Sequence, residues 1–266
     1  MGEFDEHVTV VAGGASGIGA ACASAFALEG ARVAILDIDG PGATATAMSI
    51  RESAGPEKVE AFTVDVRDDN AVNDAVASIA ARWGGIDHLV NSAVNFVAKG
   101  LTATREQWEA ALDVNVIGSA LLTARAARDM RPGATVVNIS SISAHSAQPE
   151  RWTYNATKAA ILALTRGQAL DLSPAGIRVN AVSPGWIWTP EVEKAAGGDR
   201  SRWEEVWGQY HILRRLGEAT EVADAVLFLS SSKASFITGT ELFVDGGYNA
   251  LGPEGLGDTS KFAGSS

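Results

Sequence analysis

A tyrosine and a lysine four positions apart could share one acid–base task. Tyr154 and Lys158 stand directly before an apolar run, 159–164, whose spacing is helical. Residues i and i+4 of a helix lie on one face, so the phenol and the ammonium are expected one turn apart. A free phenol has a pKa of about 10, and a cation roughly 4 Å away contributes about 4 kcal/mol, or ~2–3 pKa units. Such a tyrosine could exchange a proton with an alcohol near pH 7. The pair alone is common, and a surface lysine after a half-buried tyrosine is the plainer interpretation.

A glycine-rich stretch, 13–19, is the second candidate site. It lies between a predicted strand, 8–12, and a predicted helix, 20–29. Glycines there permit a tight turn and let a pyrophosphate approach the backbone amides, while the helix N-terminus adds about half a positive charge. The residues expected to contact a dinucleotide in this turn are Gly13, Ser16, Gly17, Ile18 and Gly19.

Asp37, at the end of the second predicted strand, fits the same kind of site. Its carboxylate could accept both hydroxyls of an adenosine ribose and would repel a 2′-phosphate. The glycine stretch holds no Lys or Arg that could bind such a phosphate. The pattern therefore favours NAD(H) over NADP(H), although a loop cap is the plainer role for Asp37.

Short β-branched runs alternate with helical stretches along the chain, which predicts βαβ units in one α/β domain with a parallel sheet. The expected strands are 8–12, 33–36, 59–64, 86–90, 135–139, 177–182 and 241–244. The expected helices are 20–29, 44–53, about 70–83, 105 to about 128, 152–172 and 221–230.

Two segments break this rhythm. The segment 183–217 is a long insertion, and such an excursion from a compact domain is usually a lid or binding loop. Residues 251–266 are rich in Gly and Ser and are expected to form a flexible tail after a single domain over 1–250.

Composition narrows the class of protein. The 266 residues, 46% hydrophobic and 20% charged, fit one large domain. A net charge of −11 disfavours nucleic acid and anionic membranes as partners. Cys22, the single cysteine, excludes an internal disulfide and suggests a reducing, cytoplasmic setting. No signal peptide or membrane-spanning run is evident, and His145 and His211 lack the companions of a metal site.

Taken together, the motifs resemble the short-chain dehydrogenase/reductase family from about residue 8 to residue 248. Ser141 precedes Tyr154 by 13 residues (154 − 141), which is the family's spacing. Each match alone is weak, whereas the ordered set is specific. The matching residues are the glycine turn, Asp37, Asp65-Val66, Asn91-Ser92-Ala93, Asn115, Ser141, Tyr154, Lys158, Pro184-Gly185-Trp186-Ile187-Trp188-Thr189 and Val244-Asp245-Gly246-Gly247.

The resemblance implies a single-domain Rossmann fold, with a doubly wound seven-stranded parallel sheet, and a catalytic tetrad. Tyr154 would be the acid/base, and Ser141 would hold the reacting oxygen. Lys158 would lower the Tyr154 pKa and reach the nicotinamide ribose, and Asn115 would hold a water on a proton path. The family also suggests a homotetramer.

Further contacts to the cofactor, NAD, follow from the resemblance. Asp65 and Val66 are expected against adenine, and Ile187 and Thr189 against the carboxamide. The other expected contacts are Asn91, Ala93, Pro184 and Gly185. Val94 departs from the family pattern, where a glycine is usual, so the loop 94–100 is expected to run differently.

The substrate side is aromatic. Trp186, Trp188, Trp203 and Trp207 lie in the insertion, while His145, Gln148, Arg151 and Trp152 lie between Ser141 and Tyr154, and Phe96 lies in another loop. One hypothesis is a roomy aromatic pocket in which Ser141, Tyr154, His145, Gln148, Trp152, Trp186 and Trp188 contact the substrate. The other, equally favoured, is that the tryptophans pack the lid on the body or on a neighbouring subunit.

The sequence thus predicts an NAD-dependent oxidoreductase that interconverts a secondary alcohol and its ketone. A cyclic, sugar-like or otherwise sizeable alcohol is the expected substrate, and oxidation the expected direction. One alternative is an NADPH-dependent carbonyl or 3-ketoacyl reductase. Another, of a different class, is a non-catalytic NAD-sensing regulatory protein, against which the complete tetrad argues.

Overall fold

The computed structural model describes residues 2–256, apart from the side chain of Glu254. Its strands are β1 (Val8–Ala12), β2 (Arg32–Asp37), β3 (Val59–Thr63), β4 (Ile86–Asn91), β5 (Met130–Ile139), β6 (Arg178–Pro184), β7 (Ile187–Trp188), β8 (Gly217–Glu218) and β9 (Glu241–Val244). Its α-helices are α1 (Gly17–Leu28), α2 (Gly40–Ala54), α3 (Asp69–Trp83), α4 (Arg105–Leu112), α5 (Ser119–Ala126), α6 (Trp152–Leu172), α7 (Pro190–Ala195), α8 (Arg200–Gly208) and α9 (Ala219–Ser230).

Seven strands form the main sheet in the order β3-β2-β1-β4-β5-β6-β9. Every neighbouring pair is parallel, which confirms the predicted seven-stranded parallel sheet. The chain first builds outward from β1 through β2 to β3 and then returns to add β4 on the other side of β1. In open α/β sheets, ligands bind at the carboxyl ends of the strands beside such a reversal.

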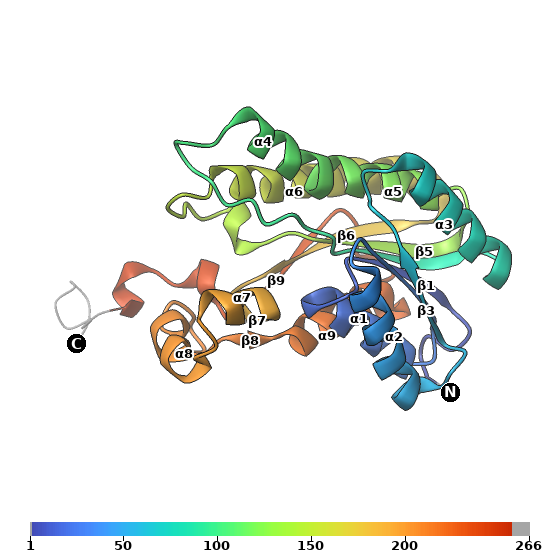
Figure 1. Ribbon diagram of the computed structural model, residues 1–266, viewed down its shortest axis with the longest axis horizontal. Helices are drawn as coiled ribbons and strands as arrows, with labels where there is room; N and C mark the ends of the chain where they lie inside the picture. The colour runs from blue at the N-terminus through green and yellow to red at the C-terminus, as the bar shows by residue number, and fades with distance from the viewer. Residues whose placement is uncertain (1, 257–266) are drawn as a thin grey trace.

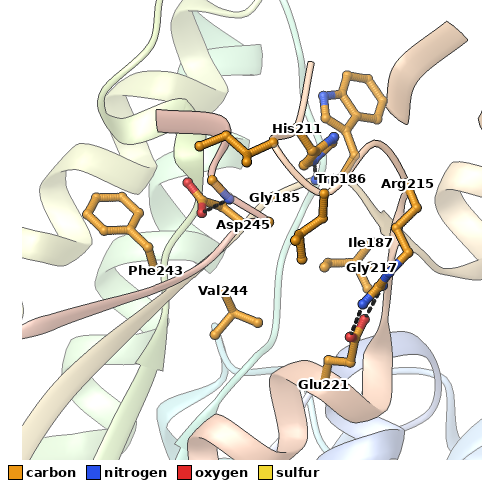
Figure 2. Close-up of a pocket in the computed structure, with 14 residues that line it drawn as sticks. Gly185, Trp186, Ile187, His211, Arg215, Gly217, Glu221, Phe243, Val244 and Asp245 are labelled. Carbon is orange, nitrogen blue, oxygen red and sulfur yellow. Dashed lines mark hydrogen bonds and ion pairs between the residues drawn. The ribbon is translucent and has the colours of Figure 1, made fainter. Parts of the chain in front are cut away.

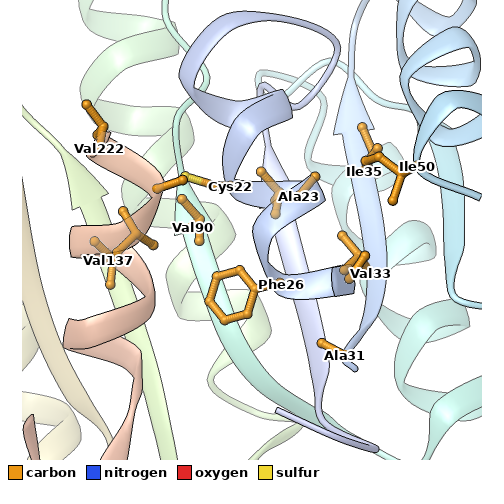
Figure 3. Packing of buried hydrophobic residues seen from close by; sticks show 14 of the residues in the cluster. Cys22, Ala23, Phe26, Ala31, Val33, Ile35, Ile50, Val90, Val137 and Val222 are labelled. Carbon is orange, nitrogen blue, oxygen red and sulfur yellow. The ribbon is translucent and has the colours of Figure 1, made fainter. Parts of the chain in front are cut away.

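Helices cover both faces of the sheet, as Figure 1 shows: α1, α2 and α9 lie on one face, and α3, α4, α5 and α6 on the other. Buried Val, Ile, Leu and Ala side chains of the strands pack against each layer. On the α1 side, Cys22 and Phe26 project toward Val90 and Val137 of the sheet and toward Val222 of α9 (Figure 3). Burial raises the pKa of the Cys22 thiol to about 12, as expected for a packing residue.

The predicted helix 105–128 is interrupted. A π-helical segment, Asp113–Gly118, separates α4 from α5. Asn115 lies in it and bonds to Asn95, twenty residues away in sequence, so the interruption depends on a tertiary contact that periodicity does not reveal. The helix predicted at 44–53 also begins earlier, at Gly40, because Asp39 accepts a hydrogen bond from the amide of Gly42.

The insertion after β6 is folded rather than a loose loop. It carries α7 and α8, and its two ends pair as the parallel strands β7 and β8. In Figure 1 these elements lie together below the end of α6 and beside β9. Of the predicted flexible tail 251–266, residues 257–266 lie outside the described residues. Among residues 2–256, no helix is both long and apolar enough to cross a membrane.

Candidate functional site

One cavity of about 700 Å³ opens at the carboxyl ends of the strands. It is lined by the segments that follow six strands, β1 to β6, and by the start of α6 and of α7. Gly13, the segment 16–18 and the segment 36–38 belong to the lining, and so do Ser141, Tyr154 and Lys158. The glycine turn and the Tyr–Lys pair, 135 residues apart in sequence (154 − 19), therefore share one cavity.

The N-terminus of α1 faces this cavity without a side-chain cap. Ser16 occupies the N-cap position, but its hydroxyl makes no capping hydrogen bond, whereas Asp39 and Asp68 cap α2 and α3. Gly13 and Gly17 have φ values of 76° and 56°, a region that disfavours side chains. The free amides of such a helix end suit a pyrophosphate, so the turn fits the dinucleotide that the sequence predicts.

Gly19 does not line the cavity but explains how closely α1 packs. A Cβ built on Gly19 would collide with the carbonyl oxygen of Gly13. The glycine therefore keeps the helix tight against the turn, a role separate from contact with a ligand.

Asp37 is positioned by the backbone at its own end of the cavity. Its Oδ2 accepts a hydrogen bond of 2.9 Å from the amide of Ala15, and its Oδ1 accepts one of 2.9 Å from the amide of Asp39. These bonds hold the carboxylate beside the glycine turn, where it can meet ribose hydroxyls.

A cation that the sequence reasoning missed lies at the same end. Arg67 lines the cavity and pairs with Asp65, with Nη2 2.6 Å from Oδ2. The Arg67 guanidinium holds the pKa of the Asp65 carboxyl below its ordinary value. Arg67 follows Asp65 by two residues, and this short spacing of opposite charges was the sequence signal that could have predicted an ion pair in the loop. Val66, between them, also lines the cavity.

Tyr154, Ser141 and Lys158 meet at the other part of the cavity. The Ser141 hydroxyl lies beside the Tyr154 phenol and lowers its pKa, and its Oγ accepts a 3.1 Å hydrogen bond from the amide of Ser143. The Lys158 ammonium donates a hydrogen bond of 2.9 Å to the carbonyl oxygen of Ile139, at the end of β5, and lies 5.6 Å from the centroid of the Tyr154 ring. The Ser140 hydroxyl donates to the carbonyl of Lys158, which ties α6 to the end of β5.

The electrostatics of the pair differ from the sequence expectation. Burial raises the pKa of Tyr154 above its ordinary value, and the Ser141 hydrogen bond and the charge of Arg151 oppose that rise. Burial also lowers the pKa of Lys158 to about 8. Lys158 therefore does not lower the Tyr154 pKa below its ordinary value in the protein alone. Its ammonium is bonded to a carbonyl, and burial away from water disfavours its charged form.

Asn115 lies behind the cavity rather than on its lining. Its Oδ1 accepts a 2.7 Å hydrogen bond from the amide of Asn95, and its Nδ2 donates to the Asn95 carbonyl at 3.2 Å and to Thr157 Oγ1 at 3.1 Å. Asn115 thus joins the loop after β4 to α6 next to Tyr154. This contact also sets the path of the loop in which Val94 departs from the family pattern.

Most of the expected cofactor residues line the cavity, and two, Gly19 and Asn91, do not. The lining ones are Gly13, Ser16, Gly17, Ile18, Asp37, Asp65, Val66, Ala93, Tyr154, Lys158, Pro184, Gly185, Ile187 and Thr189. Asn91 is buried beneath it, where its amide donates to Thr123 Oγ1 and to Asn138 Oδ1. Its position is set by a polar network inside the sheet.

The expected substrate residues divide in the same way. Ser141, Gln148, Tyr154 and Trp186 line the cavity. His145 instead bonds to Glu241 at 2.8 Å, Trp152 is 54% exposed, and Trp188 lies under the guanidinium of Arg200. The structure therefore does not place these three at the cavity.

The lid tryptophans serve mainly as packing. Trp203 stacks on Trp207 at 4.6 Å between ring centroids, and Trp207 stacks on Trp186 at 4.8 Å. Only Trp186, at one end of this stack, also faces the cavity. The stack lies within the lid itself rather than between the lid and the body, and the contact of Trp186 with substrate stays a prediction.

A second cavity of about 410 Å³ shares Gly185, Trp186 and Ile187 with the first. Figure 2 shows His211 beside Trp186 and the ion pair between Arg215 and Glu221. The Trp186 amide donates to His211 Nε2 at 3.2 Å, so the histidine anchors the start of the lid. Burial lowers the His211 pKa, which favours the neutral ring that accepts this bond.

Phe96 and Arg151 complete the site, and the sequence indicated them only by position. The Phe96 ring lies 4.6 Å from the Tyr154 ring, and both Phe96 and Arg151 line the cavity. Neither residue type marks a site by itself, so the sequence offered only their nearness to the matched motifs. In the described part of the chain, no cluster of three or more His, Cys, Asp or Glu side chains could hold a metal ion.

Comparisons with known proteins extend over nearly the whole chain. Residues 13–249 match a family model described as Enoyl-(Acyl carrier protein) reductase. A cis-4-hydroxycyclohexanecarboxylate dehydrogenase of Sinomonas cyclohexanicum is 38% identical over 94% of this chain and 100% of its own length. A cyclopentanol dehydrogenase of Comamonas sp. is 36% identical over 94% and 100%. The crystal structure of a Brucella melitensis protein titled short-chain dehydrogenase/reductase SDR: glucose/ribitol dehydrogenase superposes with a TM-score of 0.86, at 33% identity over 93% and 99%.

Proposed function

The chain belongs to the short-chain dehydrogenase/reductase family, and on that premise we propose that it oxidises a secondary alcohol to its ketone with NAD. The observation that carries this proposal is the meeting of Tyr154, Ser141 and Lys158 in the same cavity as the glycine turn. A nucleotide-sensing protein would have no use for a buried phenol and ammonium at the end of its cofactor cleft.

NAD as the cofactor is supported by two features of the cavity. The N-terminus of α1 is uncapped, and Asp37 is held beside it by two backbone amides. A second phosphate on the ribose would meet the Asp37 carboxylate, and like charges in contact cost several kcal/mol. Arg67, the nearby cation, is already paired with Asp65. The nicotinamide, when bound, supplies the hydride chemistry.

The protein's own groups would manage the proton. Tyr154 would take the proton of the alcohol, while Ser141 donates a hydrogen bond to the same oxygen. Lys158 would supply positive charge beside the phenolate. Ring contact with Phe96 would exclude water from the Tyr154 side of the cavity. Asn115 would act by positioning, through its bonds to the loop and to Thr157.

A cyclic or sugar-like alcohol is supported by the lining and by the relatives. Phe96 and Trp186 supply apolar faces in the cavity, and Gln148 supplies a polar group. Relatives that match over nearly their full length are named as dehydrogenases of cyclopentanol and of a hydroxycyclohexane acid. We propose that the lid, 183–217, closes over substrates of this size.

Carbonyl reduction with NADPH is the second candidate, because one observation favours it. Burial raises the pKa of Tyr154, which keeps the phenol protonated and ready to donate to a ketone oxygen. The two candidates differ in cofactor and in the direction that works near neutral pH.

A panel of cyclic alcohols, sugars and hydroxy acids, assayed with NAD and with NADP, tests the proposal. We expect reduced cofactor to form with NAD. Tyr154→Phe should lower the rate by about 10²–10⁴-fold, the range contributed by a general acid–base group. A Tyr154→Phe protein that is folded and fully active, or a clear preference for NADP, would contradict the proposal.

A further inference from the structure

We propose that Arg151 binds an anionic group, a carboxylate, carried by the substrate at the opposite end from its reacting hydroxyl. The substrate class would then be an alicyclic hydroxy acid rather than a neutral alcohol or sugar. This inference rests on the proposed dehydrogenase function and narrows its substrate.

The position of Arg151 is the first step. Arg151 is the N-cap residue of α6 and precedes Tyr154 by three residues, and both line the cavity. Its charge reaches the Tyr154 phenol strongly enough to oppose the rise of that pKa. A group bound to the guanidinium therefore lies in the same compartment as the reacting oxygen.

The second step is what surrounds the guanidinium. Its Cζ lies 5.4 Å from the centroid of the Phe96 ring and 5.5 Å from that of the Trp186 ring. Aromatic rings hold a guanidinium through its flat face, and the N–H groups, which lie in its plane, stay available for a carboxylate. The two rings come from different segments, the loop after β4 and the lid.

The third step is the balance of charge. No carboxylate among the described side chains forms an ion pair with Arg151, although the chain carries a net charge of −11. Of the acidic residues on the cavity lining, Asp37 bonds to backbone amides and Asp65 to Arg67. The third acidic residue of the lining, Glu191, follows Pro190, whose ring lies next to Gly17 in the glycine turn. Two cations of the cavity lining therefore lack a protein carboxylate: Lys158, whose ammonium bonds to the Ile139 carbonyl beside Tyr154, and Arg151.

Two neighbours support the same assignment. Gln148 lines the cavity, and its Oε1 already accepts a 2.8 Å hydrogen bond from the Ser143 hydroxyl, which orients its amide nitrogen as a second donor for an anion. Glu150, directly before Arg151, has a φ of 55°, in a region that non-glycine residues rarely adopt. Such strained residues gather at sites where they fix a functional side chain.

The test compares two substrates of one shape, cis-4-hydroxycyclohexanecarboxylate and its neutral amide, with NAD. We expect wild type to prefer the acid. In Arg151→Gln, the ratio of kcat/KM for acid to amide should fall by about 30- to 300-fold, as when one partner of a buried charge pair is removed. The ratio cancels any change in Tyr154 reactivity, which affects both substrates equally. Arg151→Lys, which keeps the charge but not the fork, should lie between.

Arg202→Gln is the matched control. Arg202 also lies over a lid tryptophan, 5.3 Å from the Trp203 ring, but it does not line the cavity. In Arg202→Gln, the ratio of kcat/KM for acid to amide should stay within about threefold of the wild-type ratio, as is usual for a surface change.

A binding measurement separates this inference from the proposed function. Calorimetry with cyclohexanecarboxylate in the presence of NAD needs no turnover, and wild type should bind it at least about tenfold more tightly than Arg151→Gln does. Oxidation of the amide as readily as the acid, with an unchanged ratio in Arg151→Gln, would overturn the inference and leave the dehydrogenase intact. Arginine-dependent binding of the acid without oxidation of any alcohol would overturn the proposed function while supporting the anion site.

Discussion

The ring of Phe96 lies against the ring of Tyr154, with centroids 4.6 Å apart and planes inclined at 56°. Phe96 comes from the loop after β4, the loop that Asn115 holds through Asn95. One contact therefore links the expected acid/base group to a loop that the sequence left unplaced. Because a phenyl ring removes water from its neighbour, the contact also bears on the Tyr154 pKa.

Phe96→Ala should shift the pH profile of alcohol oxidation. Oxidation needs the deprotonated phenol, so its rate rises with pH through the Tyr154 pKa. Burial holds that pKa above its ordinary value, and opening the ring contact admits water and lowers it. The rising limb of kcat/KM should therefore move to lower pH, while KM rises because the aromatic face is lost. A limb that moves to higher pH would contradict the assignment of burial as the cause.

Asp37→Ser should change the choice of cofactor. Removing the carboxylate removes the repulsion of a 2′-phosphate, so the ratio of kcat/KM for NAD to NADP should fall by at least about tenfold, which corresponds to about 1.4 kcal/mol. Asp39→Ser is the control, because Asp39 caps α2 and does not line the cavity. Serine is about as good an N-cap as aspartate, so both stability and the ratio should stay nearly unchanged. Steady-state rates with both cofactors measure the effect.

Asn115→Ala should weaken both folding and turnover. The change leaves the Asn95 amide without its partner, and an unsatisfied buried donor costs about 1–3 kcal/mol. Urea unfolding should show that loss, and kcat should fall because the loop and α6 are no longer joined at Thr157. Asn73→Ala, an exposed change on α3, should alter neither. Wild-type stability in Asn115→Ala would refute the positioning role.

Stability should fall in mild acid because of His88. Burial lowers the pKa of this histidine to about 3 from an ordinary 6.5, so between these values the unfolded chain takes up a proton that the folded protein does not. The free energy of unfolding should therefore decrease as the pH is lowered from 6.5 toward 3, by up to about 1.4 kcal/mol per pH unit. Glu221, with a pKa lowered from 4.5 to about 2, adds its own loss only below 4.5.

Chemical unfolding between pH 6.5 and 5 lies above the range of the Glu221 carboxyl and reports on buried histidines, His88 and His211, whose pKa burial also lowers. His88→Gln, which cannot titrate there, should flatten the slope even if it lowers stability at every pH. His88 bonds to Thr135 at 2.7 Å and to His7 at 2.9 Å, so a polar replacement is the fairer choice. An unchanged slope would show that other groups cause the acid sensitivity.

The bounds of helices and strands were predicted best where a single local sequence feature marks where the element begins and ends. The helix predicted at 152–172 and the strand predicted at 241–244 have the bounds of α6 and β9. The β1 strand also matches, because an unbroken apolar run ends at the glycine turn. By contrast, β5 begins at Met130, before its apolar run, where pairing with Ile86 of β4 extends the strand.

The site could be predicted only as far as its motifs reach. Tyr154 and Lys158 were found by their helical spacing and Ser141 by the family resemblance, and the structure brings all three to one cavity with the glycine turn. Arg151 was singled out only for its nearness to Tyr154, because its meaning depends on two rings from distant segments. Trp188 and His145 were expected at the cavity because of sequence proximity, yet Arg200 and Glu241 hold them elsewhere. Such pairings are tertiary and leave no periodic signal.

The short parallel pair β7–β8 has a consequence for how this protein can change. Ile187 pairs with Gly217 and Trp188 with Glu218, so the excursion over the cavity leaves and rejoins the body at adjacent points. The chain between β7 and β8 can therefore become longer or shorter, or be replaced, while the seven-stranded sheet keeps its register. Replacing the segment between β7 and β8 could then change which substrates fit, while the residues proposed for hydride and proton transfer stay in place.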